Sequence, residues 1–163
     1  MINYFVIWKS YSLGDERDMK SKIRVMQSAD SADVIAMMRV FYSSPAVLSN
    51  GSEEIFSNDV KNCVNGNPYL EGYIMEDSNN IQGYAMIAKS FSTEFGKPCI
   101  WIEDLYIKEE YRGLGLGNLF MEFITTEYED CIFRLEVEEE NERAIGRDQE
   151  RSSCCYRSSR YAS

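Results

Sequence analysis

Apolar and polar residues alternate over some segments of the chain and recur with a helical period over others. Residues 22–27 alternate as a strand does, and residues 28–31 offer side chains that can cap the helix predicted to follow them and to end at Pro45. A second helix is predicted over residues 53–64, ended by Asn65-Gly66. Its apolar side is expected to contain Ile55, Phe56, Val60 and Val64.

The middle of the chain reads as three successive strands. Residues 69–76 and 81–91 are predicted to form a hairpin through the polar residues 77–80. Residues 98–107 are more apolar, and this strand is expected in the middle of the sheet.

A helix and a last strand follow. The helix is predicted over about residues 114–129, and its apolar stripe consists of Leu116, Leu119, Phe120, Phe123 and Ile124. The last strand, residues 131–137, should direct Phe133, Leu135 and Val137 to one face.

The order of these elements predicts an α+β fold. The three closely linked strands should form an antiparallel meander, and the helix after them should return the chain to a parallel neighbour. The result is a mixed, mostly antiparallel central sheet with helices on both faces. We expect residues 1–20 to be an N-terminal extension, residues 21–145 to form the domain, and residues 146–163 to be an atypical tail.

Composition narrows the chemistry. The 163 residues include no histidine, which excludes Ser-His-Asp and Cys-His catalysis. The five cysteines lack metal-ligand spacing, so no metal site is predicted. No apolar run approaches the length of a membrane span and no signal peptide is evident, so we expect a cytoplasmic protein without a membrane partner.

The net charge of −10 disfavours nucleic acid as a partner. An acidic surface can attract small cationic substrates such as amines, although a charge of this sign also simply favours solubility.

Three glycines, Gly113, Gly115 and Gly117, lie between the apolar strand 98–107 and the helix after it. A glycine loop that enters a helix N-terminus presents main-chain N–H groups and a positive dipole end to one point, which suits phosphate or diphosphate. The Walker pattern is absent, and Asn118 and Phe120 stand where the dinucleotide fingerprint needs glycine.

The pattern that remains, Arg112-x-x-Gly115-x-Gly117, resembles a known family. The run IEDLYIKEEYRGLGLGNLF is similar to the acetyl-CoA-binding segment of the GNAT superfamily of N-acetyltransferases, whose pattern is [QR]xxGx[GA]. The later run LEVEEENERAI resembles that family's fifth strand and fourth helix. The resemblance implies the acyl-CoA N-acyltransferase fold, with acetyl-CoA as the acetyl donor and a primary amine as acceptor.

The resemblance also implies roles for individual residues. The arm of the cofactor would pair with the strand as an added strand does, and the loop amides would hold the diphosphate. The implied cofactor-binding residues are Leu105, Tyr106, Ile107, Arg112, Gly113, Leu114, Gly115, Leu116, Gly117, Asn118 and Asn141.

Acetyl transfer needs a neutral amine, so a base must remove a proton. Glu103 is the candidate, acting through water, while Asp104 should face the other way on a regular strand. The segment also looks like that of spermidine/spermine-type enzymes, with Phe41-Tyr42 placed as a substrate wall. Peptide amines are an alternative acceptor. Glu71 and residues 138–140 are candidates for attracting a cation, or are solvated surface charges.

The resemblance stops after about residue 145. The family's acid tyrosine is expected at position 148, which is Asp148, and no Gly-Phe or final strands follow. We therefore expect a C-terminus altered by a frameshift, truncation or added sequence. A catalytically impaired acetyl-CoA-binding or structural domain is the second interpretation, and a nucleotide-binding module of another type is a third. An uncovered edge on the last strand would favour a homodimer.

Overall fold

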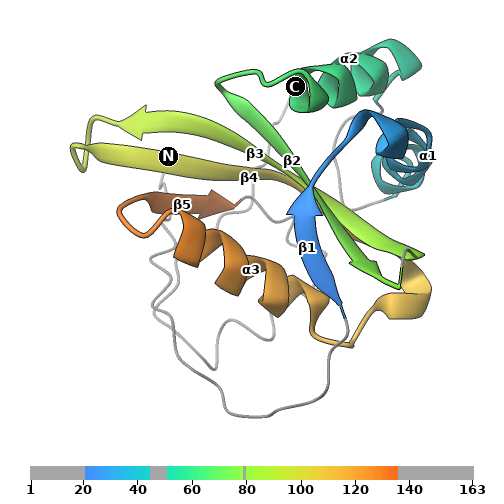
Figure 1. The fold of residues 1–163 in the computed structure, drawn as a ribbon. Coiled ribbons are helices and arrows are strands. Elements are labelled where there is room, and N and C mark those ends of the chain that lie inside the picture. The colour runs from blue at the N-terminus through green and yellow to red at the C-terminus, as the bar shows by residue number, and fades with distance from the viewer. Residues whose placement is uncertain (1–20, 45–50, 79, 136–163) are drawn as a thin grey trace.

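The computed structural model describes residues 21–44, 51–78 and 80–135. Five strands, three α-helices and two short 3-10 turns make up this part of the chain (Figure 1). In chain order they are β1 (Lys22–Val25), η1 (Ser28–Asp30), α1 (Ser31–Tyr42), α2 (Glu53–Val64), β2 (Leu70–Asp77), β3 (Asn80–Ser92), β4 (Lys97–Ile107), η2 (Glu109–Tyr111), α3 (Leu116–Glu127) and β5 (Ile132–Leu135).

The strands form one sheet in the order β1-β2-β3-β4-β5. Neighbouring strands are antiparallel except β4 and β5, which are parallel, and α3 makes the crossover between them. The predicted meander and the parallel return are therefore confirmed. Among the described strands β3 is central, and β4 is an interior strand paired on both sides.

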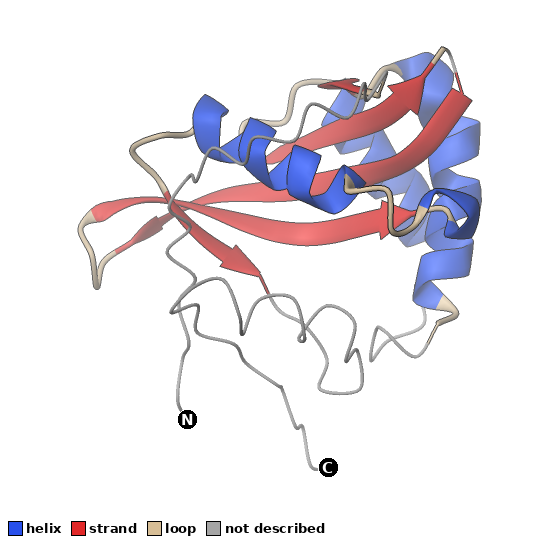
Figure 2. Ribbon diagram, turned by 90° about the horizontal axis from the view of Figure 1, so that it is seen from below, coloured by secondary structure: helices blue, strands red, loops and turns tan. Residues whose placement is uncertain are grey.

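Helices cover both faces of the sheet, as predicted. Helices α1 and α2 lie on one face, and α3 crosses the other (Figures 1 and 2). The first core gathers Val34 and Met38 of α1 with Phe56 and Val60 of α2. The second gathers the buried stripe of α3, which consists of Leu116, Phe120 and Ile124.

The prediction that Ile55 lies in the core is wrong. Ile55 of α2 is 52% exposed, and Cys63 is buried in its place. Periodicity placed Ile55 next to Phe56 on the apolar side, but the side of α2 that meets the sheet is centred on Phe56, Val60 and Cys63. The predicted bounds of this helix are confirmed.

The alternation of side chains between the two faces of the sheet is interrupted halfway along β4. Met86 of β3 is opposite Asp104, whereas the next residue, Ile87, is opposite Ile102, so Glu103 is an extra residue in a bulge. Before the bulge Ile102 packs on the α3 side, and after it Leu105 does. The strand is therefore not regular where the sequence analysis took it to be so.

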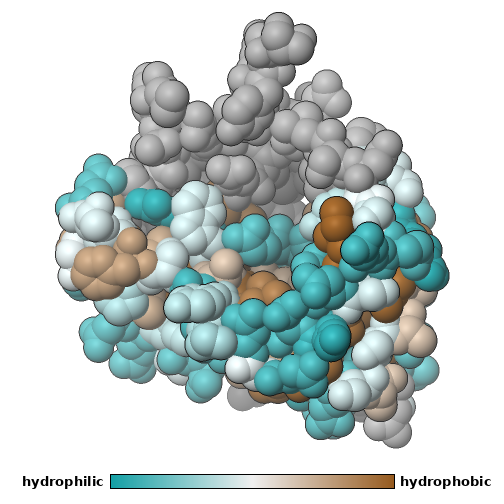
Figure 3. Space-filling view, turned by 90° about the horizontal axis from the view of Figure 1, so that it is seen from above, coloured by the Kyte–Doolittle hydropathy of each residue, from teal (hydrophilic) through white to brown (hydrophobic). Residues whose placement is uncertain are grey.

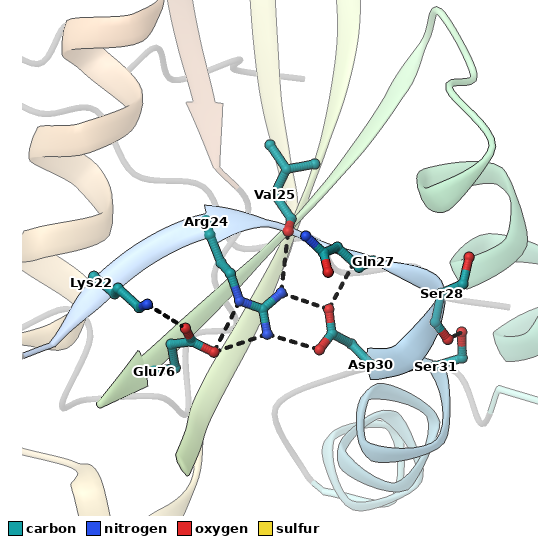
Figure 4. A network of polar contacts seen from close by, with 8 residues as sticks. All are labelled: Lys22, Arg24, Val25, Gln27, Ser28, Asp30, Ser31 and Glu76. Atoms are coloured by element: carbon teal, nitrogen blue, oxygen red, sulfur yellow. Dashed lines mark hydrogen bonds and ion pairs between the residues drawn. The ribbon is translucent and has the colours of Figure 1, made fainter. Parts of the chain in front are cut away.

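An ionic network fastens the edge strand β1 to β2 and to the start of α1 (Figure 4). The Arg24 guanidinium donates to both carboxylate oxygens of Asp30, at 2.7 and 2.8 Å, and to Glu76 at 2.9 Å. Lys22 adds an ion pair with Glu76 at 3.0 Å. Asp30 also accepts from the Gln27 amide, so its carboxylate holds the chain that enters α1 and makes no cap hydrogen bond to that helix.

The surface around α1 and α2 is mainly hydrophilic and is broken by small hydrophobic areas (Figure 3). None of the helices in the described part of the chain is both long and apolar enough to span a bilayer.

Candidate active site

Strand β4 pairs with β5 before the bulge. Among the described residues, of which Leu135 is the last, this pairing runs from Cys99 and Ile132 to Ile102 and Leu135. From Asp104 to Ile107 the strand continues to pair with β3 but with no other strand of the described residues. Among the described residues this stretch therefore presents an open edge, and Glu103 stands where that edge begins.

The main-chain groups on this edge belong to Leu105 and Ile107. Pairs in an antiparallel ladder alternate between those that exchange hydrogen bonds and those that do not. The Lys108 amide donates to the Gln82 carbonyl at 2.9 Å, so Tyr106, two residues earlier, also turns its main chain toward β3. Leu105 and Ile107 turn theirs to the open edge, and Tyr106 instead packs its ring in the core beside α1.

The chain leaves this edge through η2 and a loop with two left-handed glycines. Gly113 has φ of 80° and Gly115 has φ of 87°, values that favour glycine. Gly115 is the N-cap of α3, which begins at Leu116. The loop therefore delivers the N-terminus of α3 next to the end of β4.

Several amides of this loop are available to a ligand. The Arg112 amide donates to the Glu109 carbonyl at 3.1 Å. In the described part of the chain, the amides from Gly113 to Asn118 have no protein acceptor. The partial positive charge of the helix N-terminus adds to them. Among the described residues, a built Cβ on Gly117 would meet only the Ile107 Cδ1 atom, at 3.9 Å, so these residues leave the side of the helix near β4 open.

On the other side of β4, Asp104 is buried between two tyrosines. The residue is only 3% exposed, and its carboxylate accepts from the Tyr42 hydroxyl at 2.9 Å and the Tyr84 hydroxyl at 3.0 Å. Burial raises the pKa of Asp104, and the two hydroxyls partly oppose that rise. The pKa values of both tyrosines are raised, first by burial and then by the Asp104 charge.

The carboxylates of Asp59 and Glu103 also affect the pKa values of this group of side chains. The negative charge of Asp59, on α2, raises the pKa of Asp104, and Asp59 and Glu103 both raise that of Tyr42. Burial raises the pKa of Asp59 itself. Glu103 is exposed, in contrast to Asp104. Three acidic residues from α2 and β4 therefore share one side of the sheet with the tyrosines.

Glu71 proves to be an internal partner of other side chains. It accepts from the Tyr73 hydroxyl at 2.6 Å and the Tyr128 hydroxyl at 2.5 Å, and it pairs with Lys89. Burial alone would raise the pKa of Glu71, but the hydrogen bonds from these three groups bring it below the ordinary value. The suggestion that it attracts a cationic substrate is therefore replaced by a structural role, since its cation is Lys89.

Sequence reasoning missed Tyr84 and Asp59. Tyr84 lies within a buried, apolar strand, and a tyrosine in such a place needs a partner for its hydroxyl. Asp59 precedes Val60 on the inner side of α2, where a carboxylate is unusual. Phe41-Tyr42 does line this region, with the Phe41 ring centroid 6.0 Å from that of Tyr106. Asn141, Asp148 and residues 138–140 lie outside the described residues.

Sequence comparison identifies the family. A family model described as the acetyltransferase (GNAT) family matches residues 36–147. The chain belongs to this family. Its enzyme class is thereby acetyl-CoA-dependent N-acetyltransferase, with acetyl-CoA as donor, as the sequence analysis expected. Comparison with curated proteins found no match.

Solved structures confirm the fold. A possible acetyltransferase from Clostridium difficile 630 is similar with a TM-score of 0.69 at 17% identity, over 88% of this chain and 97% of that one. AAC(6')-Iy, in complex with a bisubstrate analog, has a TM-score of 0.67 at 12% identity, over 88% and 97% of the two chains. A predicted acetyltransferase with acetyl-CoA from Clostridium acetobutylicum has a TM-score of 0.62 at 15% identity, over 82% and 91%.

Proposed function

We propose that this chain moves the acetyl group of acetyl-CoA to a primary amine of a small, polycationic molecule of the polyamine type. The observation that carries the proposal is the continuity of the open β4 edge with the unpaired amides that begin α3. An extended amide-containing arm suits the first, and a diphosphate suits the second.

The cofactor would be held mainly by main-chain groups. Leu105 and Ile107 supply the edge, and the amides from Gly113 to Asn118 supply the diphosphate site. Tyr106 and Arg112 contribute by packing and by side-chain contacts rather than through their amides. Asn141, named by the family resemblance, completes the proposed set.

The acidic residues on the α1/α2 side support a cationic acceptor. Asp59 and Glu103 lie close enough to Tyr42 to affect its pKa, and Asp104 is fixed behind it. Opposite charges within a few ångströms favour an ammonium group, and the aromatic rings of Phe41 and Tyr106 favour cations as well. An acceptor with two amino groups could present one neutral nitrogen for attack while the other remains charged.

Glu103 is the proposed base. Its position at the start of the open edge places it beside the point where an arm paired with β4 would end. It would take the amine proton through a water molecule as the new C–N bond forms and the C–S bond of the thioester breaks. The leaving thiolate takes up a proton to give coenzyme A.

A second candidate function is an acetyl-CoA-binding domain with impaired turnover. The observation that favours it is in the sequence, where Asp148 stands at the position expected for the acid tyrosine. A cytoplasmic location, a homodimer and an altered C-terminus stay predictions from the sequence.

Two measurements separate these functions. Titration calorimetry measures acetyl-CoA binding, and a thiol-release assay measures turnover with 1,4-diaminobutane, spermidine, butylamine and an amino-terminal peptide. Binding with amine-dependent thiol release supports the proposal, and preference for the diamine over butylamine supports its substrate class. Binding without release under any amine favours the impaired domain. Absence of binding contradicts both.

A variant on α2 tests the substrate class. Asp59→Asn should raise the KM for diaminobutane about fivefold and leave that for butylamine unchanged, which corresponds to one partly exposed charge pair. Glu54→Gln removes an exposed charge from the same helix and is the matched control. Equal effects of the two substitutions would contradict the proposed cation site.

A further inference from the structure

The side chain of Arg112 folds back from the glycine loop onto the end of β4. Its Nε–H donates to the Ile107 carbonyl at 2.9 Å. Its guanidinium carbon lies 5.8 Å from the centroid of the Tyr106 ring. Two contacts of different kinds, one directed and one a cation–π contact, therefore hold this exposed side chain against the strand.

These contacts change what the open edge offers. Without Arg112 the edge would present the N–H and C=O groups of both Leu105 and Ile107. The Nε–H group of Arg112 occupies the Ile107 carbonyl and leaves the Ile107 amide and both groups of Leu105. The edge therefore has one preferred place for an added strand rather than two equivalent ones.

We propose that Arg112 is a positioning residue that sets the register of the cofactor arm on β4. The inference rests on the proposed function, because it concerns an arm paired with this edge. Equivalent groups on one edge repeat every second residue, so a slipped arm would be displaced by about 6.6 Å. Reacting atoms must approach within about 3.5 Å, so such a slip would separate the thioester carbon from an amine nitrogen held beside Glu103.

Charge alone is the competing explanation, because a cation near the loop would also attract a diphosphate. The two explanations differ in the group they require. Register setting requires an N–H donor at the position of Nε, whereas attraction requires only a positive charge. The Nε2 atom of glutamine is attached at the same distance along the side chain as the Nε atom of arginine, and it is neutral. Lysine keeps the charge but has a methylene group at that position.

The experiment compares Arg112→Gln, Arg112→Lys and Arg112→Met with the unmodified chain, using acetyl-CoA and S-acetylpantetheine as donors. S-acetylpantetheine has the arm without the diphosphate. Register setting predicts that kcat/KM falls about tenfold in Arg112→Met and Arg112→Lys with both donors and stays within about threefold in Arg112→Gln. Activity that is retained in Arg112→Lys but lost in Arg112→Gln, or losses that occur with acetyl-CoA and not with S-acetylpantetheine, would overturn the proposal.

A measurement without donor separates this inference from the proposed function. The Arg112 Nε–H signal, assigned by its loss in Arg112→Lys, should exchange slowly with water in the ¹H–¹⁵N spectrum. Rapid exchange, at the rate of free arginine in water, would overturn the inference whatever the donor affinity. Slow exchange in a chain that does not bind acetyl-CoA would instead contradict the proposed function and leave the contact in place.

Discussion

The hydroxyl group of Tyr84 donates a hydrogen bond to the carboxylate of Asp104 at 3.0 Å, from the strand next to it and within the core. Tyr84 itself is fully buried. Tyr42 approaches the same carboxylate from α1. A buried carboxylate with two hydroxyl donors fixes the end of α1 against β4, which makes this contact a determinant of both stability and site geometry.

Removing one donor should therefore destabilise the fold. We expect Tyr84→Phe to lower the free energy of unfolding at pH 7 by about 1–3 kcal/mol, since it leaves a buried carboxylate with one partner fewer. Urea denaturation measures the change. Tyr69→Phe, at a side chain that is 71% exposed, is the matched control and should have little effect. Equal stabilities of Tyr84→Phe and the control would contradict this account of Asp104.

The same contact predicts a dependence on pH. Burial raises the pKa of Asp104, so the folded chain binds this proton more readily than the unfolded chain does. The contribution of Asp104 to the free energy of unfolding is therefore lost as pH rises. The cost of Tyr84→Phe should thus be larger at pH 7 than at a pH at which Asp104 is protonated. Denaturation at several pH values checks the difference between the variant and the original chain. A cost that grows toward acid pH would refute the assignment.

The ionic network around Arg24 changes stability with pH in the opposite direction. Arg24 holds the pKa of Asp30 and of Glu76 below their ordinary values, with Lys22 contributing to Glu76. Their contribution is therefore present above the ordinary carboxyl range and is lost as pH falls through the lowered pKa values.

Arg24→Met should lower the free energy of unfolding at pH 7 by about 1–3 kcal/mol, and it should flatten the loss of stability below about pH 5. Denaturation curves from pH 7 downward measure both effects. Arg39→Met, which breaks an exposed ion pair with Glu53, is the control and should change neither quantity measurably. An unchanged acid slope in Arg24→Met would show that other carboxylates dominate it.

Substitutions at the loop glycines can distinguish the effect of backbone strain on stability from the effect of an added side chain on ligand binding. Gly115→Ala should destabilise the chain by about 1–2 kcal/mol because φ is positive, and it should weaken acetyl-CoA binding by more than about tenfold. Gly66→Ala, with φ of 73° at the end of α2, imposes similar strain away from the site. It should reduce stability without changing the affinity. Calorimetry and denaturation give both quantities for each variant.

Gly117 provides the complementary case. It lies within α3 with a normal backbone, so alanine should not destabilise the fold and could add about 0.5–1 kcal/mol. Any loss of acetyl-CoA affinity in Gly117→Ala would then come from the added Cβ meeting the ligand. We expect such a loss, and an unchanged affinity would place the cofactor away from this side of the helix.

Glu103→Gln tests the proposed base. We expect kcat to fall by about 10²–10⁴-fold while the affinity for acetyl-CoA stays the same. The loss should diminish at high pH, where more of the amine is already neutral. Glu94→Gln, in the turn between β3 and β4, is an exposed control. A kcat for Glu103→Gln equal to that of the control would remove Glu103 from the mechanism.

Local pattern was enough for most of the fold. The bounds of α2, the β2–β3 hairpin and the apolar stripe of α3 follow from periodicity and turn residues, because each depends on neighbours within a few positions. The glycine loop was equally evident, since left-handed backbone at Gly113 and Gly115 requires that residue type. The acetyltransferase family followed from this short run.

Only the tertiary structure decided how the parts of the site meet. The apolar residues on the α3 side of β4 are even-numbered before Glu103, as Ile100 and Ile102 are, and odd-numbered after it, as Leu105 and Ile107 are. The bulge at Glu103 that causes this shift became clear only from the pairing with β3. Tyr42 and Asp104 are 62 residues apart in the chain. Such contacts depend on how α1, α2 and β4 pack together, and periodicity describes each element separately, so it specifies which side of an element is buried but not which distant side chain it will touch.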